Sequence, residues 1–211
     1  MLKTKMNSAL LLALALAAPA LPAQEVAPNL LLQSTTLEVI AAMKQERDLH
    51  GGQPLQVASL VETKVLPLFD FPRMTQIAVA RNWGTATPAQ QAALTAEFKT
   101  LLVRTYSTAL SSYRDQVIEF RNMRSAPADT EVTVRSVVKQ SGAEPIAMNY
   151  DMAKTPAGWK VFDITVAGIS LVTTYRDSFA ASVRDGGVDG LIKALADKNR
   201  QLGSRSAAPR S

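Results

Sequence analysis

Two aspartates are the residues of this chain best placed for acid-base chemistry. Asp163 lies in the middle of the apolar run WKVFDITV, and Asp70 lies between two phenylalanines. Apolar surroundings raise a carboxyl pKa, so either residue could act as a general acid or base. The alternative is structural: Asp163 could pair with Arg121 or Arg135 across a sheet, and Asp70 precedes Pro72 as a helix N-cap would. We expect the structural roles.

Metal, thiol and phosphate chemistry is disfavoured by the residue types present. The sequence has no cysteine and a single histidine, His50, next to Gly51-Gly52 in an expected loop. One histidine supports neither a two-histidine metal site nor a serine nucleophile with a histidine base. The pairs Gly51-Gly52 and Gly186-Gly187 are typical of helix ends and lack the context of a phosphate-binding loop. We therefore expect no metal and no cofactor.

An apolar surplus is the strongest remaining signal. Soft, polarizable side chains of this kind suit the lining of an irregular cavity. Filled cores use the same residues, so composition alone leaves both interpretations open. The set comprises Met74, Met123, Met148, Met152, Phe120, Tyr150 and Phe162.

Length and charge limit the possible classes of protein. The 211 residues, 47% of them hydrophobic and 19% charged, are typical of one globular domain with appendages. The net charge is +5, with 23 basic and 18 acidic side chains. Removing Lys3 and Lys5, which lie in a predicted leader, leaves 23 − 2 − 18 = +3. This charge is too small for a nucleic-acid-binding surface.

The first residues have the pattern of an export signal. Lys3 and Lys5 precede the short apolar stretch from Ser8 to Ala18, and small residues follow at the expected cleavage site. That stretch is too short to span a bilayer, which disfavours an uncleaved membrane anchor. We predict a signal peptide over residues 1–23, one domain over 24–202 and a mobile polar tail over 203–211.

The remaining patterns predict an α+β fold in which helices precede and follow a sheet. Thr87 and Gln90 form a capping box before the longest helix, and Asp189 is expected to cap the last helix. Helices are expected over residues 28–50, 54–67, 88–113, 169–183 and 189–202. One more helix is expected to have Pro72 in its first turn. Strands are expected over residues 116–124, 130–140, 144–154 and 158–167. The last two strands form a hairpin, and Gly168 is expected to be a hinge between strand and helix.

Five blocks of sequence resemble the MlaC family, also called the toluene-tolerance Ttg2 family. They are VLPLFDFPRM, RNWGTATPAQQAAL, FKTLLVRTYSTALSSY, GWKVFDITVAGISLVTTYRDSF and GLIKALADKN. The resemblance implies a periplasmic phospholipid-binding protein that shuttles lipid between an outer-membrane lipoprotein complex and an inner-membrane ABC transporter complex. It also implies a curved antiparallel or mixed sheet of about four strands, packed with helices around a deep apolar pocket. Where the family usually has Leu-Gly, this chain has Val79-Ala80.

The resemblance and the apolar alternation together predict which residues line this pocket. Alternation along strands selects one sheet face, and helical spacing selects one helix face. The predicted lipid-binding residues are Leu102, Tyr106, Leu110, Ile118, Phe120, Val134, Ile146, Met148, Tyr150, Phe162, Ile164, Val166, Ile169, Leu171 and Val172.

Together with the apolar surplus, the resemblance implies a monomeric, non-enzymatic carrier of diacyl phospholipid that maintains outer-membrane lipid asymmetry. Two alternatives remain. An exported enzyme would use Asp163 or Asp70 as a base, whereas a structural adaptor between membrane complexes would have a filled core.

Overall fold

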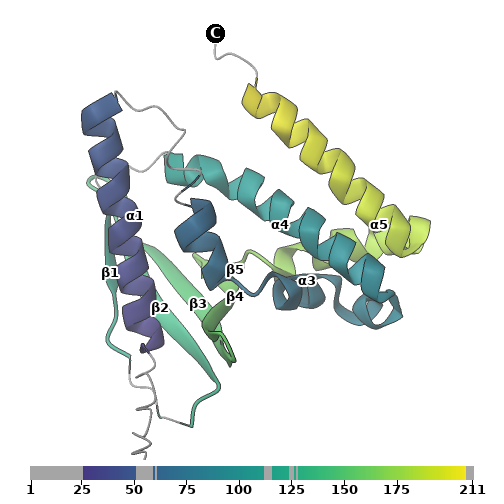
Figure 1. Ribbon diagram of the computed structural model, residues 1–211, viewed down its shortest axis with the longest axis horizontal. Helices are drawn as coiled ribbons and strands as arrows, with labels where there is room; N and C mark the ends of the chain where they lie inside the picture. The colour runs from purple at the N-terminus through teal and green to yellow at the C-terminus, as the bar shows by residue number, and fades with distance from the viewer. Residues whose placement is uncertain are drawn as a thin grey trace, which may run out of the picture.

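The computed structural model describes residues 26–50, 59, 61–111, 116–123, 126 and 128–207, with side chains described except at 46–50, 107–111 and 205–207 (Figure 1). The fold is α+β, as predicted, but the described sheet has five strands. The helices are α1 (Pro28–His50), α3 (Phe71–Val79), α4 (Pro88–Ser111) and α5 (Arg176–Ala207). Short helical turns cover Val61–Val65, Leu66–Leu68, Ala80–Thr85 and Thr173–Tyr175. Of the helix predicted over 54–67, residues 54–58 and 60 lie outside the described residues, and 61–67 form two short helical turns in place of one regular helix.

Two predicted helix starts are confirmed by their caps. The Asp70 carboxylate accepts a hydrogen bond of 3.0 Å from the Arg73 N–H at the start of α3. At the start of α4, the Gln90 N–H donates to the Thr87 hydroxyl at 3.2 Å, and the Thr87 N–H donates to the Gln90 side chain at 2.9 Å. These caps satisfy N–H groups that have no partner within the helix.

The five strands form an antiparallel meander in which each strand pairs with the next along the chain. They are β1 (Val117–Phe120), β2 (Glu131–Lys139), β3 (Ile146–Thr155), β4 (Gly158–Val166) and β5 (Ile169–Ser170). The predicted hairpin of 144–154 with 158–167 is confirmed as β3 and β4.

The helix predicted directly after Gly168 is wrong. Ala167 and Gly168 have φ angles of 49° and 85°, and they form a two-residue turn that returns the chain as β5. Two consecutive positive φ angles are typical of tight hairpin turns. Helix α5 begins only at Arg176. The apolar run after Gly168 was too short to distinguish a strand from a helix by period.

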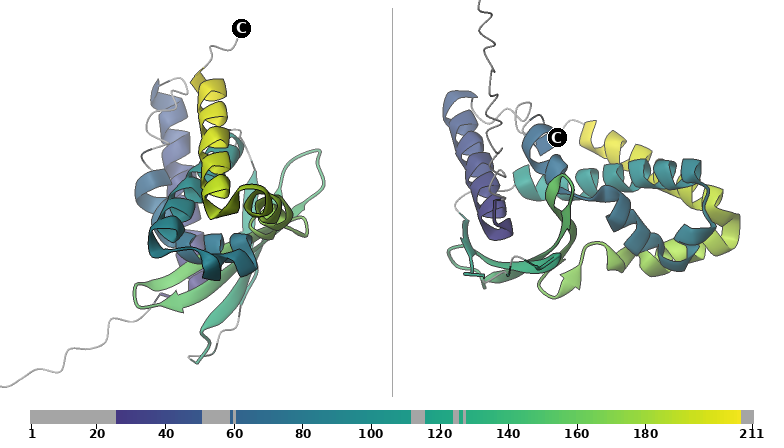
Figure 2. Two further views of the ribbon diagram at one scale, coloured as in Figure 1. Left: turned by 90° about the vertical axis from the view of Figure 1, so that its right-hand side faces the viewer. Right: turned by 60° about the horizontal axis from the view of Figure 1, so that its bottom comes forward.

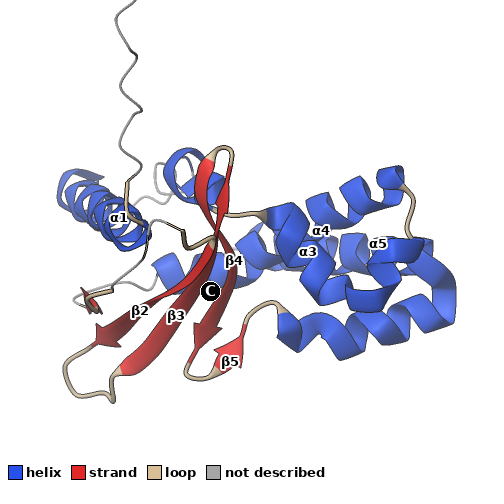
Figure 3. Cartoon of the chain, turned by 90° about the horizontal axis from the view of Figure 1, so that it is seen from below, coloured by secondary structure: helices blue, strands red, loops and turns tan. Residues whose placement is uncertain are grey.

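The helices fall into two groups around the sheet. Helix α1 lies over the concave side of the curved sheet, whereas α3, α4 and α5 pack together beyond the β4 and β5 edge (Figures 2 and 3). Each group contributes to its own apolar cluster. The helical cluster consists of Met74, Ala78, Val79, Ala86, Leu94, Phe98, Leu101, Leu102, Val172, Phe179, Leu191 and Leu195. The sheet cluster consists of Leu32 of α1 with Val134, Met152, Trp159 and Val161.

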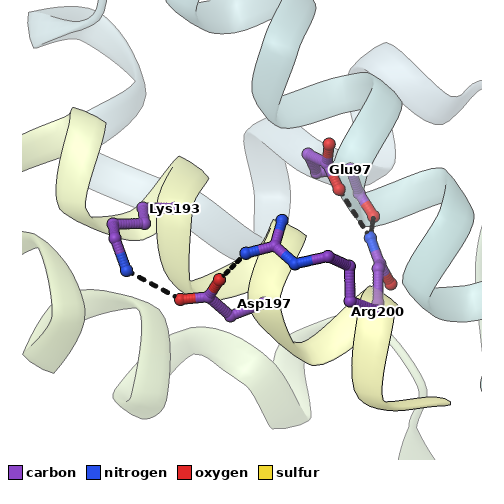
Figure 4. Close-up of polar contacts among 5 residues, drawn as sticks. Glu97, Lys193, Asp197 and Arg200 are labelled. Carbon is purple, nitrogen blue, oxygen red and sulfur yellow. Dashed lines mark hydrogen bonds and ion pairs between the residues drawn. The ribbon is translucent and has the colours of Figure 1, made fainter. Parts of the chain in front are cut away.

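Helix α5 bends at Gly187, where φ is 67° and ψ is −170°, as the predicted Gly186-Gly187 break requires. Beyond the bend, the buried Asn199 side chain donates to the Glu97 carbonyl at 2.9 Å and to the Glu97 carboxylate at 2.7 Å, which ties α5 to α4. Nearby, Lys193 and Arg200 both contact the Asp197 carboxylate (Figure 4). Asp189, predicted to cap a separate last helix, lies within α5 and accepts a hydrogen bond from the Gln90 side chain of α4. Helix α5 continues to Ala207, past the predicted end at Leu202.

Replacing Ala80 with glycine is expected to stabilise the fold. Ala80 follows α3 with φ of 54° and ψ of −130°, a conformation that strains any residue with a Cβ atom. The free energy of unfolding should rise by about 1 kcal/mol in urea denaturation. The control Ala92→Gly, on the exposed side of α4, should lower it by about 1 kcal/mol. Equal losses in both variants would contradict the strain at Ala80.

Candidate functional site

A β-bulge in β4 decides which side chains face α1. Met152 of β3 pairs with Val161, whereas its neighbour Asp151 pairs with Asp163, so Phe162 is an extra residue without a partner. An extra residue reverses the alternation of the strand beyond it. Val161 therefore lies on the same face as Ile164, although simple alternation places them on opposite faces.

Phe162 is separated from the other predicted lining residues by this bulge. The Arg73 guanidinium of α3 lies over its ring, 3.6 Å from the ring centroid. Arg73 also forms a salt bridge of 2.7 Å with Glu131, which alternates onto the face turned away from α1. Trp159 and Val161 take the place of Phe162 in the sheet cluster, and sequence alternation had missed both.

The face of the sheet toward α1 is almost entirely apolar. Residues paired across antiparallel strands share a face, so the register identifies the members. Leu31 and Leu32 of α1 pack against this side, which identifies it as the concave one. The concave face comprises Ile118, Phe120, Val132, Val134, Ser136, Val138, Ile146, Met148, Tyr150, Met152, Trp159, Val161, Ile164 and Val166, with the exposed Lys154 at its covered end.

The burial of the concave face decreases from one end of the strands to the other. Val134, Met152 and Val161 are fully buried. At the other end, the Ile146 side chain is 45% exposed, and Ile169 of β5, which pairs with Val166, is 63% exposed. The apolar face is thus covered at one end and open to an apolar guest at the other.

The fifteen predicted lining residues do not form one cluster. Leu102, Tyr106 and Val172 belong to or border the helical cluster. Phe120, Val134, Tyr150 and Ile164 belong to or border the sheet cluster. Ile118, Ile146, Met148 and Val166 extend the concave face, Ile169 and Leu171 lie on and after β5, and the side chain of Leu110 lies outside those described.

Among the residues that the structure describes, one borders both clusters. Phe69 packs against the borders of both, and it forms a parallel bridge with Val161 of β4. The next N–H, that of Asp70, donates to the Val161 carbonyl at 2.8 Å. A guest that spans from the sheet to the helices would therefore pass near this junction.

The predicted pairing of Asp163 with Arg121 or Arg135 is wrong. The buried Asp163 carboxylate instead accepts hydrogen bonds from the Ser170 hydroxyl at 2.5 Å and from the Ile164 N–H at 2.7 Å. The Ser170 oxygen in turn accepts the N–H groups of Val172 and Thr173. Both arginines are exposed, and Arg135 pairs with Asn149 in the sheet. Asp163 thus holds β5 and the turn that leads to α5.

Burial determines the ionisation of the polar groups around these clusters. Burial raises the pKa of Asp163, and the nearby Asp151 charge adds to that effect although the hydrogen bond from Ser170 opposes it. Burial also raises the pKa of Tyr150. Burial and the neighbouring Tyr175 raise the pKa of Tyr106 to about 12. Both tyrosines are therefore neutral at physiological pH.

Within the described residues, no group of three or more acidic or histidine side chains could hold a metal ion. His50, expected in a loop, is the last residue of α1, and its side chain lies outside those described. Asp70 caps α3, and Asp163 holds β5. The arrangement of these groups supports apolar binding better than acid-base chemistry.

Comparison with known proteins identifies similar sequences. The model of the MlaC protein family matches residues 33–197. The toluene tolerance protein ttg2D of Pseudomonas putida is 25% identical over 180 residues, covering 85% of this chain and 83% of that protein. The intermembrane phospholipid transport system binding protein MlaC of Haemophilus influenzae is 19% identical over 174 residues, covering 81% of each.

A similar three-dimensional structure is also known. It is that of the phospholipid-binding protein from Ralstonia solanacearum in complex with a phospholipid, at 42% sequence identity and a TM-score of 0.74. The match covers 83% of this chain and 98% of that one.

Replacing Asp163 with asparagine should remove a pH-dependent part of the stability. Because the pKa of Asp163 is raised in the folded protein, the folded state binds a proton more readily than the unfolded state. The difference in the free energy of unfolding, parent minus Asp163→Asn, should therefore increase as the pH falls. The increase should run from neutral pH toward the ordinary pKa of 3.8. Urea denaturation at a series of pH values measures this difference.

Asp197 provides a control of opposite sign. The hydrogen bond and charge of Lys193, with a further contribution from Arg200, lower the pKa of Asp197. The stability difference between the parent and Asp197→Asn should therefore decrease as the pH falls through the ordinary pKa. The same sign for both aspartates would contradict burial as the dominant influence on the pKa of Asp163.

Proposed function

The chain belongs to the MlaC family, and on that premise we propose that it is a non-enzymatic carrier of diacyl phospholipid in intermembrane lipid transport. The observation that carries this proposal is the 42% identity to the Ralstonia solanacearum protein, whose structure contains a phospholipid. The apolar concave face, open at the Ile146 end, supports it from the geometry of this chain.

The physical demand on such a carrier is the complete covering of two acyl chains. Transfer of each methylene group into water costs about 0.8 kcal/mol, so exposed tails would prevent passage through an aqueous compartment. A sheet face whose large side chains are half-buried can exchange its remaining contact with water for contact with a tail. The head group needs no such cover, which is consistent with the absence of a charged cluster among the described residues of the concave face.

The proposed lipid contacts follow from the placement of the predicted residues. The contacts on the sheet are the concave face and Ile169, now including Val161 and leaving out Phe162. Leu102, Tyr106, Leu171 and Val172 would contact the tails where the helices approach the sheet, and Leu110 remains proposed although its side chain is outside those described.

The cellular setting is also part of the proposal. Residues 1–23, outside the described part of the chain, would be an export signal, and residues 24–202 would be the periplasmic carrier. Among the described helices, none is long and apolar enough to cross a membrane. The proposed partners are the inner-membrane Mla ABC transporter complex and the outer-membrane Mla lipoprotein complex with its porin, each of which the monomer would meet in turn.

The proposal predicts that the purified protein contains lipid. Organic extraction followed by mass spectrometry should yield about one diacyl phospholipid per chain. Ile164→Glu should abolish the lipid, because a carboxylate in an apolar wall is costly to bury. Val117→Glu is the control, because Val117 is exposed and alternates onto the other face of the sheet.

Two results would favour other functions. Lipid-free extracts from well-folded parent protein would favour the structural adaptor. Retention of lipid in Ile164→Glu, with folding unchanged by circular dichroism, would place the lipid away from the concave face.

A further inference from the structure

A buried hydroxyl without a hydrogen-bond partner interrupts the apolar concave face. Ser136 in β2 is only 2% exposed, and its Oγ atom has no partner in regular hydrogen-bond geometry within the part of the chain that the structure describes. Leaving a buried polar group unpaired costs free energy, so such groups are rare without a ligand or a functional reason. The register places Ser136 opposite Met148, on the face that α1 covers.

A second hydroxyl lies beside the first. Tyr150 is in the next row of the concave face, opposite Val134, and its ring stacks on that of Phe120 with centroids 6.2 Å apart. Its hydroxyl donates a long hydrogen bond of 3.9 Å to the Met148 sulfur, and a thioether is a weak acceptor. Ser136 lies beside Tyr150 and lowers its pKa as a hydrogen-bond partner would, against the effect of burial, although the two hydroxyls do not meet in regular hydrogen-bond geometry. Two donors are therefore available to one acceptor.

The surroundings of this pair select an uncharged acceptor. Its neighbours on the concave face are Phe120, Val134 and Ile164, and burial of an anion there would need a cation. Arg135, the basic residue next to Ser136 in the strand, is exposed and alternates onto the other face. A carbonyl oxygen fits this site better than a phosphate oxygen.

The depth of Ser136 and Tyr150 in the concave face matches the position of the ester groups in an acylglycerol lipid. Ser136 and Met148 form the row just inside that of Val138 and the half-exposed Ile146, about 7 Å along the strands. The ester groups of such a lipid lie between its tails and its head group. A guest with covered tails and an exposed head group therefore brings its esters to a position just inside the open end.

We infer that the Ser136 and Tyr150 hydroxyls donate hydrogen bonds to an ester carbonyl oxygen of the bound acylglycerol lipid. This inference rests on the proposed function as a phospholipid carrier. It assigns to the site a preference for lipids with ester-linked chains, in addition to its affinity for apolar tails.

The test compares two lipids that differ only in the carbonyl groups. Delipidated protein is titrated with diacyl phosphatidylethanolamine and with the dialkyl ether analogue of the same chain length. The parent should bind the ester lipid about threefold to tenfold more tightly for each hydrogen bond made. Ser136→Ala and Tyr150→Phe should each reduce this preference, because each should lower the affinity for the ester lipid and leave that for the ether lipid unchanged. Ser178→Ala and Tyr175→Phe in the helical part are the matched controls and should retain it.

The stability of the lipid-free protein gives a second measurement. Ser136→Ala removes a buried hydroxyl that has no partner, so the urea midpoint of the empty protein should stay equal or rise. A clear decrease would mean that the hydroxyl has a partner in the empty protein, and it would overturn the inference.

The outcomes separate this inference from the proposed function. Equal affinity of the parent for ester and ether lipids would overturn the role of Ser136 and Tyr150 and leave the carrier function intact. Binding of neither lipid would overturn the carrier function and this inference with it.

Discussion

The pairing of β3 with β4 is the constraint on which the rest of the structure depends. The extra residue at Phe162 turns Trp159 and Val161 toward α1 while Ile164 and Val166 remain on the same side. Without this shift, one half of β4 would present its apolar side chains away from the sheet cluster. The bulge also places Phe162 under the Arg73 guanidinium, so the same extra residue completes the concave face and fastens α3 to the sheet.

The separation of the apolar residues into two clusters is the feature most relevant to carrying a guest. In a protein with a single filled core, helices α4 and α5 would pack onto the concave face. Here those helices complete a cluster of their own around Phe98, and α1 covers the sheet. Three sets of contacts connect the two parts: Phe69 with β4, Arg73 with Phe162 and Glu131, and the hydrogen bonds among Asp163, Ser170 and Thr173.

The polar groups have two different roles: some hold backbone in place, and others face the proposed lipid site. The carboxylates that could have served an enzyme hold backbone in place, Asp70 at a helix start and Asp163 at a strand turn. The groups that we assign to a ligand are the hydroxyls of Ser136 and Tyr150, which are neutral and therefore tolerable in an apolar wall. This division is what a carrier of neutral tails and esters requires.

The sequence by itself determined the features that depend on neighbouring residues. The caps at Asp70 and Thr87, the break at Gly187 and the β3 and β4 hairpin were predictable because each rests on contacts within a few positions. Sequence blocks also identified the family. Only the tertiary structure decided the bulge at Phe162, the strand β5 and the true partner of Asp163, because each depends on which distant strand a residue meets. Alternation assumes an unbroken register, and a single unpaired residue is enough to move Val161 and Trp159 into the candidate site and Phe162 out of it.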